Sequence, residues 1–317
     1  MRRYLLACIL VLFCLDLRAQ DSIAKTLDDA HALMGQGRYG QVLDMLTPLL
    51  SSSALDAAER GKALVLVAAG YQAAGKFSEA HRALDQSLSL LRDNPQCVSD
   101  YADALANLSA LYRDTGDLDA MKQTAMKALQ LYEQTNDHFG LVGIYVLLAQ
   151  DALNRRKSAD AEHYLAQAEQ ESRQVSNQWD GYRIALADSR AAIALLEGHP
   201  MLAVEDYGQS LDLRIQLNGE QNPGTGWGYM LLGKANLQAG DIQSALVNMK
   251  QGLAILAQAG AEGRVAYLYS EVAYSEALAA DGQRSQARQI KAEATRALTS
   301  LYRDHCATCQ INAVAFR

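Results

Sequence analysis

Proline and aromatic residues are scarce in this chain of 317 residues, which contains four prolines and only 7% aromatic side chains. Few prolines means few positions at which a helix must bend or stop. Half of the residues are nevertheless apolar, so the chain can bury a sizeable hydrophobic surface. This composition predicts an all-α protein.

Catalytic motifs are also missing. The sequence has no GxSxG and no HExxH segment, and its six histidines are scattered. Residues 35–40 form a literal GxGxxG, but a helix-like segment and not a strand precedes it, which argues against dinucleotide binding. Glu271 and Glu276 lie five residues apart and are a weak pair for acid–base hydrolysis; a solvated helix face is the simpler interpretation. We therefore predict no enzyme activity and no cofactor.

The first nineteen residues have the pattern of a secretory signal peptide. Arg2 and Arg3 precede an apolar run over residues 4–15, and Ala19 ends a plausible cleavage region. A retained membrane anchor is the weaker alternative, because a spanning helix needs about 20 apolar residues. We expect residues 1–19 to be removed and the protein to be periplasmic or secreted, with no membrane span after cleavage.

Positive charge is not concentrated in any run of the sequence. The whole chain has a formal net charge of −7, and removal of residues 1–19 leaves 26 basic and 35 acidic residues. No basic stripe is evident, so binding of nucleic acid through its phosphates is not expected.

Three cysteines remain after removal of the signal peptide: Cys97, Cys306 and Cys309. An odd number in an oxidising compartment leaves one thiol free or paired between chains. Cys306 and Cys309 form a CxxC after the last helical pattern, where a local disulfide or two buried thiols would fix the tail. Redox chemistry, or a metal site with His305, is the alternative. We expect residues 304–317 to form a cap over the last helices.

A helical hairpin recurs along the rest of the chain. Its clearest copy is 231–256, LLGKANLQAGDIQSALVNMKQGLAIL, in which apolar residues at helical spacing flank a turn at Gly240. Turn glycines recur at intervals of 38, 41, 82, 42 and 42 residues, and a turn without glycine at residues 155–161 divides the long interval. Seven hairpins of about 40 residues are predicted, with turn glycines Gly37, Gly75, Gly116, Gly198, Gly240 and Gly282. One hairpin buries too little surface alone, so the copies should stack.

These hairpins resemble tetratricopeptide repeats. A small residue recurs midway along each first helix, at Ala30, Ala68, Ser109, Ala149, Ala191, Gly233 and Ser275, and alanine recurs five residues after most turns, at Ala80, Ala161, Ala203, Ala245 and Ala287. The long period and the segment 210–223, which ends in Gly219 and Asn222-Pro223, are similar to the repeats of kinesin light chains. The resemblance implies a right-handed superhelical solenoid of seven antiparallel hairpins over residues 22–303.

The resemblance further implies a scaffold that binds a protein or peptide in the concave groove lined by the first helices. Asn107 occupies the place of an asparagine that holds the partner's backbone in kinesin light chains, although the other repeats lack it. From the small residue of each repeat, groove positions include His31, Lys62, Asp103, Arg113, Gln150, Asp188, Trp227, Lys234, Tyr269 and Glu276. Trp227 and Tyr269, with Lys234 and Glu276 beside them, are candidate anchors, and Arg113 and Asn107 complete the predicted partner site. Packing between repeats is an equally good interpretation of both aromatics.

Two other functions stay open at this point. A thiol-redox protein would use Cys306 and Cys309. A sensory or regulatory module would act through a separate signalling protein.

Overall fold

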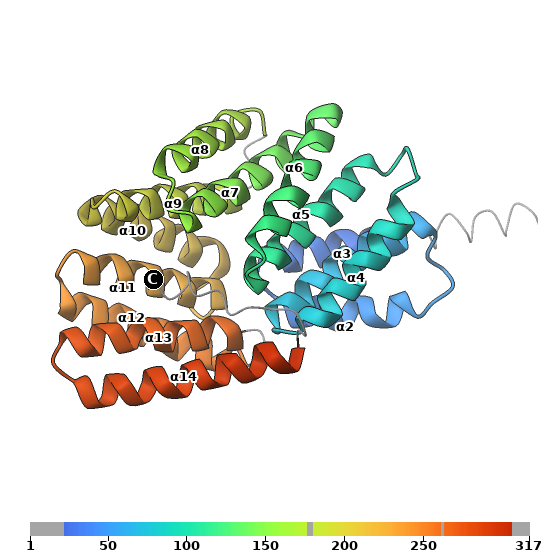
Figure 1. Cartoon of the computed structure of the whole chain (residues 1–317). Coiled ribbons are helices and arrows are strands. Elements are labelled where there is room, and N and C mark those ends of the chain that lie inside the picture. The colour runs from blue at the N-terminus through green and yellow to red at the C-terminus, as the bar shows by residue number, and fades with distance from the viewer. Residues whose placement is uncertain (1–21, 176–179, 261–262, 306–317) are drawn as a thin grey trace, which may run out of the picture.

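The prediction of an all-α chain of seven hairpins is confirmed. The structure is a computed structural model that describes residues 22–175, 180–260 and 263–305, and within these ranges it contains helices and turns but no strand. A first helix covers residues 22–35. It is followed by α2 (Tyr39–Leu50), α3 (Ala57–Ala73), α4 (Phe77–Leu91), α5 (Val98–Thr115), α6 (Leu118–Thr135), α7 (His138–Asn154), α8 (Ser158–Ser172), α9 (Asp180–Leu196), α10 (Pro200–Asn218), α11 (Pro223–Gln238), α12 (Ile242–Gln258), α13 (Arg264–Ala280) and α14 (Arg284–His305), which pack in sequence order (Figure 1).

Left-handed residues end the first helix of each hairpin. All six predicted turn glycines have a positive φ, between 70° and 87°. In the turn without glycine, Arg156 takes this conformation with a φ of 58°. At the Gly240 turn the backbone N–H of Asp241 bonds back to the carbonyl of Asn236 at 2.9 Å, and the Asp241 carboxylate accepts from the N–H of Ser244 at 3.0 Å. One short turn therefore closes α11 and starts α12.

Small residues allow the paired helices to approach each other. All seven predicted mid-helix positions, from Ala30 to Ser275, are buried. A Cβ added at Gly233 would lie 2.6 Å from the Met249 side chain, and Ala245 beside it is fully buried. The register assigned from the sequence is thus confirmed.

First helices begin earlier than the apolar pattern indicates. The pattern places the start of the sixth hairpin at Leu231, whereas α11 begins at Pro223. Asn222 is the N-cap of α11, and its side chain accepts from the N–H of Gly224 at 2.8 Å. Gly219 before it has a φ of 85°. The glycine that ends one hairpin and the Asn-Pro that starts the next are placed as predicted from kinesin-light-chain-like repeats.

The first helices form the inner side of the curve. Neighbouring first helices touch one another in the pairs α3–α5, α5–α7, α7–α9 and α11–α13, whereas neighbouring second helices make no comparable contact in the described chain. Elements that approach one another lie on the concave side of a curved stack. We call the surface formed by α3, α5, α7, α9, α11 and α13 the inner surface.

The curve brings the two ends of the array together, which the sequence did not predict. Tyr302 near the end of α14 is 2% exposed, and its ring lies 5.1 Å from that of Phe77 at the start of α4. Its hydroxyl donates to the backbone carbonyl of Asp114 at 2.9 Å. Leu301 packs against the Gly75 turn. We call these the closing contact; in Figure 1 the end of α14 lies beside the first hairpins.

Two terminal predictions fall largely outside the described residues. These are the signal peptide over residues 1–19 and the cap with Cys306 and Cys309. The helix α14 itself runs to His305. Of the helices that the structure describes, none combines the length and apolarity needed to cross a bilayer.

Candidate functional site

Polar side chains on three successive first helices are joined across the inner surface. Gln72 of α3 donates its amide to the Asp114 carboxylate of α5 at 2.6 Å. The Nε of Arg113 donates to the same carboxylate at 2.8 Å, and its Nη1 donates to Oε1 of Gln150 in α7 at 2.6 Å. Arg113 and Asp114 are each about 30% exposed, so solvent reaches this row. We call these four residues the polar belt.

The polar belt continues into the closing contact. The carbonyl of Asp114 accepts from Tyr302, whose hydroxyl also pairs with that of Tyr269 at 2.7 Å. Arg113 and Tyr269 were predicted to lie in the concave groove, in the third and seventh hairpins. The structure instead brings them near one another, through Asp114 and Tyr302. Tyr269 is therefore part of the contact between the two ends of the array.

A carboxylate with a raised pKa lies on the same surface. Asp103 of α5 accepts a hydrogen bond from the Tyr132 hydroxyl at 2.6 Å. Desolvation raises the pKa of Asp103 to about 6, and the charge of Asp137 adds to this, while the Tyr132 bond opposes it. The Asp103 side chain is still reachable by solvent. A group surrounded by protein yet open to water is what a concave surface provides.

Replacing Asp103 with asparagine should stabilise the protein near neutral pH. Because the folded-state pKa is raised, ionisation of Asp103 favours the unfolded state increasingly from about pH 4 to pH 6 and fully above pH 6, whereas below about pH 4 both states are protonated. With allowance for screening of this accessible group, we expect a gain of about 1 kcal/mol at pH 7 that disappears toward pH 4. Urea unfolding at both pH values measures it. Asp212→Asn, on an exposed position of α10, is the control, and an equal gain there would contradict the assignment.

The other predicted anchors lie in the sixth and seventh hairpins. Trp227 is half-buried against the cluster around Met230 and Met249, whereas Tyr269 packs against the cluster that contains Tyr302. Desolvation lowers the pKa of Lys234, and the charge of Glu276 partly offsets this. Trp227 and Tyr269 thus belong to two different apolar clusters, one of which forms the closing contact.

The remaining predicted groove residues differ in their contacts. Asn107 donates its amide to the carbonyl of Asp103 at 2.9 Å within α5. Lys62 pairs with Asp100 at 3.1 Å. Asp188 bonds Arg214 and accepts from Ser210 at 2.5 Å, which ties α9 to α10. His31, in the first helix, is exposed.

Sequence reasoning missed Gln72, Asp114, Tyr132 and Tyr302. Gln72 and Arg113 each lie four residues after the small residue of their helix, so the repeat register could have found Gln72. No local signal marks Tyr302, because the carbonyl of Asp114 that it contacts lies 188 residues earlier in the chain.

Cys97 is the one cysteine within the described ranges. It is a buried free thiol at the N-cap of α5. Desolvation, and next the charge of Asp100, raises the pKa of this thiol. A buried thiol with a raised pKa is a poor nucleophile, so Cys97 has a packing role.

Comparison with known proteins identifies the repeat. Residues 183–258 match the tetratricopeptide repeat family, which confirms the resemblance in the fifth and sixth hairpins. No curated protein matches the chain in sequence.

Solved structures extend this likeness to the fold of the whole array. A Rap protein complexed with competence and sporulation factor has a TM-score of 0.64 at 11% identity, over 90% of this chain and 79% of that one. The APC/C hetero-tetramer Cut9–Hcn1 has a TM-score of 0.56 at 17% identity, over 84% of this chain and 48% of that one. BtubC (BKLC) from P. vanneervenii has a TM-score of 0.51 at 20% identity, over 71% and 91%. At these identities the likeness establishes a tetratricopeptide-like solenoid.

Proposed function

We propose that this protein is an exported scaffold that holds a peptide or a segment of a partner protein against its inner surface, without a chemical step. The polar belt is the observation that carries this proposal. Guanidinium, amide and carboxylate groups follow one another across α3, α5 and α7 and remain open to solvent. Such groups can exchange their mutual hydrogen bonds for bonds to the backbone of an extended segment.

The likeness to other repeat proteins supports a scaffold of this kind. One similar structure is a complex with competence and sporulation factor and another is a hetero-tetramer. Export rests on the signal-peptide pattern of residues 1–19.

Site-specific photocrosslinking in the native host tests which surface is used. A photoreactive amino acid at Gln150, in the polar belt, should capture a discrete partner. The photoreactive amino acid in place of Gln130, at an exposed position of α6, is the matched control. Arg113→Ala combined with Gln72→Ala should reduce capture at Gln150 at least about tenfold, which corresponds to a loss of about 1.4 kcal/mol.

Two results would decide against the proposal. Capture only at Gln130 would place the partner on the outer surface. Undiminished capture at Gln150 in the double variant would show that the polar belt does not hold the partner.

A further inference from the structure

The last helix carries polar residues where the other second helices carry apolar ones. Nine and thirteen residues after the turn glycine, α12 has Met249 and Leu253, and α10 has Tyr207 and Leu211. Met249 and Leu253 belong to the cluster packed between α12 and α13. The equivalent residues of α14 are Lys291 and Thr295, and both are exposed. This side of α14 is therefore the side on which an eighth hairpin would have packed.

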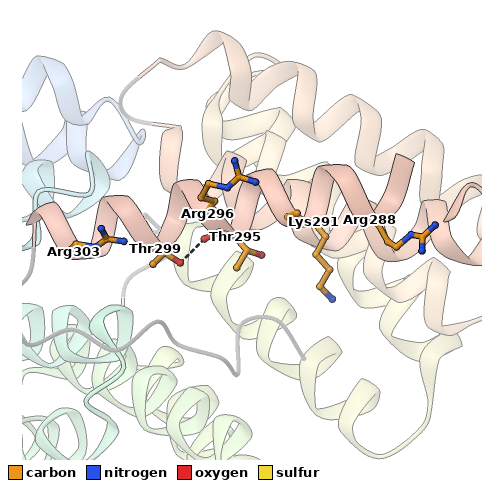
Figure 2. Close-up of a pocket in the computed structure, with 7 residues that line it drawn as sticks. Arg288, Lys291, Thr295, Arg296, Thr299 and Arg303 are labelled. Atoms are coloured by element: carbon orange, nitrogen blue, oxygen red, sulfur yellow. Dashed lines mark hydrogen bonds between the residues drawn. The ribbon is translucent and has the colours of Figure 1, made fainter. Parts of the chain in front are cut away.

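A basic stripe covers this side, although no run of the sequence indicates it. It lines an open depression of about 490 Å³ and includes Arg288, Lys291, Arg296 and Arg303, with Thr295 and Thr299 between them (Figure 2). Lys291 lies 3.7 Å from Glu276, whereas no carboxylate of the described chain pairs with the three arginines. The expectation that the chain lacks a basic stripe was wrong, because residues three to eight apart align only once the helix is formed.

A polar outer face alone would explain a soluble end to a repeat array. A mixture of both signs of charge would serve that purpose equally well. The three arginines without a carboxylate partner repel one another, and Lys291 adds a fourth positive charge that Glu276 only partly offsets, which favours binding of a negatively charged surface.

The same chain presents an acidic groove of matching size. It lies between α8, α9 and α10 and has a volume of about 480 Å³. Leu165, Ile193 and Ala194 contribute apolar lining, and Leu202 beside them is 56% exposed. The polar lining contains the carboxylates Glu162, Glu169, Glu197, Glu205 and Asp206 against one arginine, Arg190, which lies 2.9 Å from Glu169 and 3.5 Å from Asp206.

We propose that the basic stripe on α14 of one copy docks in the acidic groove of a second copy. Four positive side chains line the stripe, one of them paired with Glu276, and they meet a groove lined by five carboxylates and one arginine. Ala292, Thr295 and Thr299 have short side chains at the centre of the stripe. The α14 helix can therefore approach the apolar lining of the groove closely, while its arginine and lysine side chains reach the carboxylates around it. The polar belt on α3, α5 and α7 takes no part, so this inference is independent of the proposed function.

The chemistry of the stripe favours this occupant over a nucleic acid or a membrane. None of the large exposed apolar side chains of the described chain lies on α14, so the helix has nothing to insert into lipid. Aromatic rings for stacking with bases are likewise absent from the lining.

Association through two different patches has a definite consequence. In a pair, one copy has used its stripe and the other its groove, so the first still has a free groove and the second a free stripe. Further copies can add at both ends unless the rotation between copies closes a ring. Assembly should therefore depend on concentration and weaken with salt.

Charge reversal with complementation tests the proposal. Sedimentation velocity of the full protein, with a reducing agent to exclude cysteine bridges, should show species larger than a monomer at low salt. Arg288→Glu with Arg296→Glu should weaken association about tenfold or more, and Glu162→Lys with Glu205→Lys should do the same. Mixing the two variants should restore association. The introduced carboxylates in the stripe of the first then meet the introduced lysines in the groove of the second, and the unchanged stripe of the second meets the unchanged groove of the first.

Controls separate this contact from a general effect of charge. Arg82→Glu with Lys127→Glu makes the same change in net charge at exposed positions outside both patches and should leave association intact. A wild-type protein that stays monomeric at its highest soluble concentration at low salt would overturn the proposal. Binding of that monomer to polyglutamate or to anionic vesicles would instead assign the stripe to another partner, and variants that fail to complement each other would refute the pairing.

Discussion

Replacing Tyr302 with alanine is expected to open the array while leaving its helices intact. The ring is buried against Phe77, and the hydroxyl joins Tyr269 to the carbonyl of Asp114. Truncation of a buried aromatic residue costs about 3–5 kcal/mol. Two of these three partners belong to the opposite end of the array, so most of that cost should fall on the closing contact. Small-angle scattering should show a larger radius of gyration, with helical circular dichroism almost unchanged.

Two companion variants make this result specific. Tyr302→Phe keeps the ring and removes the hydroxyl, so it should cost only about 1 kcal/mol and leave the radius of gyration unchanged. Tyr207→Ala removes a buried tyrosine from the cluster between α9, α10 and α11 and should lower stability without opening the array. An opening equal to that of Tyr302→Ala in the Tyr207 variant would show that general destabilisation, and not the closing contact, sets the shape.

Replacing Gly252 with alanine should destabilise the protein by about 1–3 kcal/mol through overpacking. A Cβ at this position would lie 2.6 Å from the backbone carbonyl oxygen of Gly226, and the two helices would have to separate. A backbone atom cannot rotate away as a side chain can. The clash therefore outweighs the gain in helix propensity, which is about 1 kcal/mol. Chemical denaturation monitored by circular dichroism measures the difference.

Gly208 offers the matched comparison, because it also lies inside a helix but a Cβ there would meet nothing within 4 Å. Gly208→Ala should stabilise the protein by up to about 1 kcal/mol. The free energy of unfolding should therefore fall in Gly252→Ala and rise in Gly208→Ala. A gain at both positions would contradict the close approach of α11 and α12.

Contacts within a hairpin could be predicted from the sequence because they depend on neighbouring residues. Gly240 and its equivalents adopt the left-handed conformation, and Gly233 and Ala245 are buried where two helices meet. Each of these features needs only a turn and a small residue at fixed spacing. The first residues of the helices were harder to predict from apolar periodicity. The α11 helix, for example, begins with Pro223-Gly-Thr-Gly, before any apolar periodicity appears.

The closure of the array could not be predicted in the same way. Small rotations between successive hairpins accumulate, and no local pattern records their sum. For Tyr269 the sequence left open a groove anchor or packing between repeats, and it could not show that this tyrosine contributes to the closing contact. Asn222 is a second case: the resemblance placed Asn222-Pro223 at the start of a hairpin, but could not show that the Asn222 amide donates to the carbonyl of Gln36 at 2.5 Å.

The candidate site was predicted in part. Arg113 and Gln150 were placed on the inner surface from the repeat register, and they are hydrogen-bonded to each other. The sequence could not show that Asp114 joins Gln72 to Arg113, because that bond depends on the distance between α3 and α5.

The distance between Lys76 and Ser300, measured with a spin label at each position, tests the central claim that the two ends of the array meet. Lys76 follows the Gly75 turn, and Ser300 precedes Leu301, which packs against that turn. With Cys97, Cys306 and Cys309 replaced, a closed array predicts one narrow population at the short end of the measurable range, which broadens and lengthens in Tyr302→Ala. A broad, long-distance distribution in the otherwise wild-type protein would contradict it.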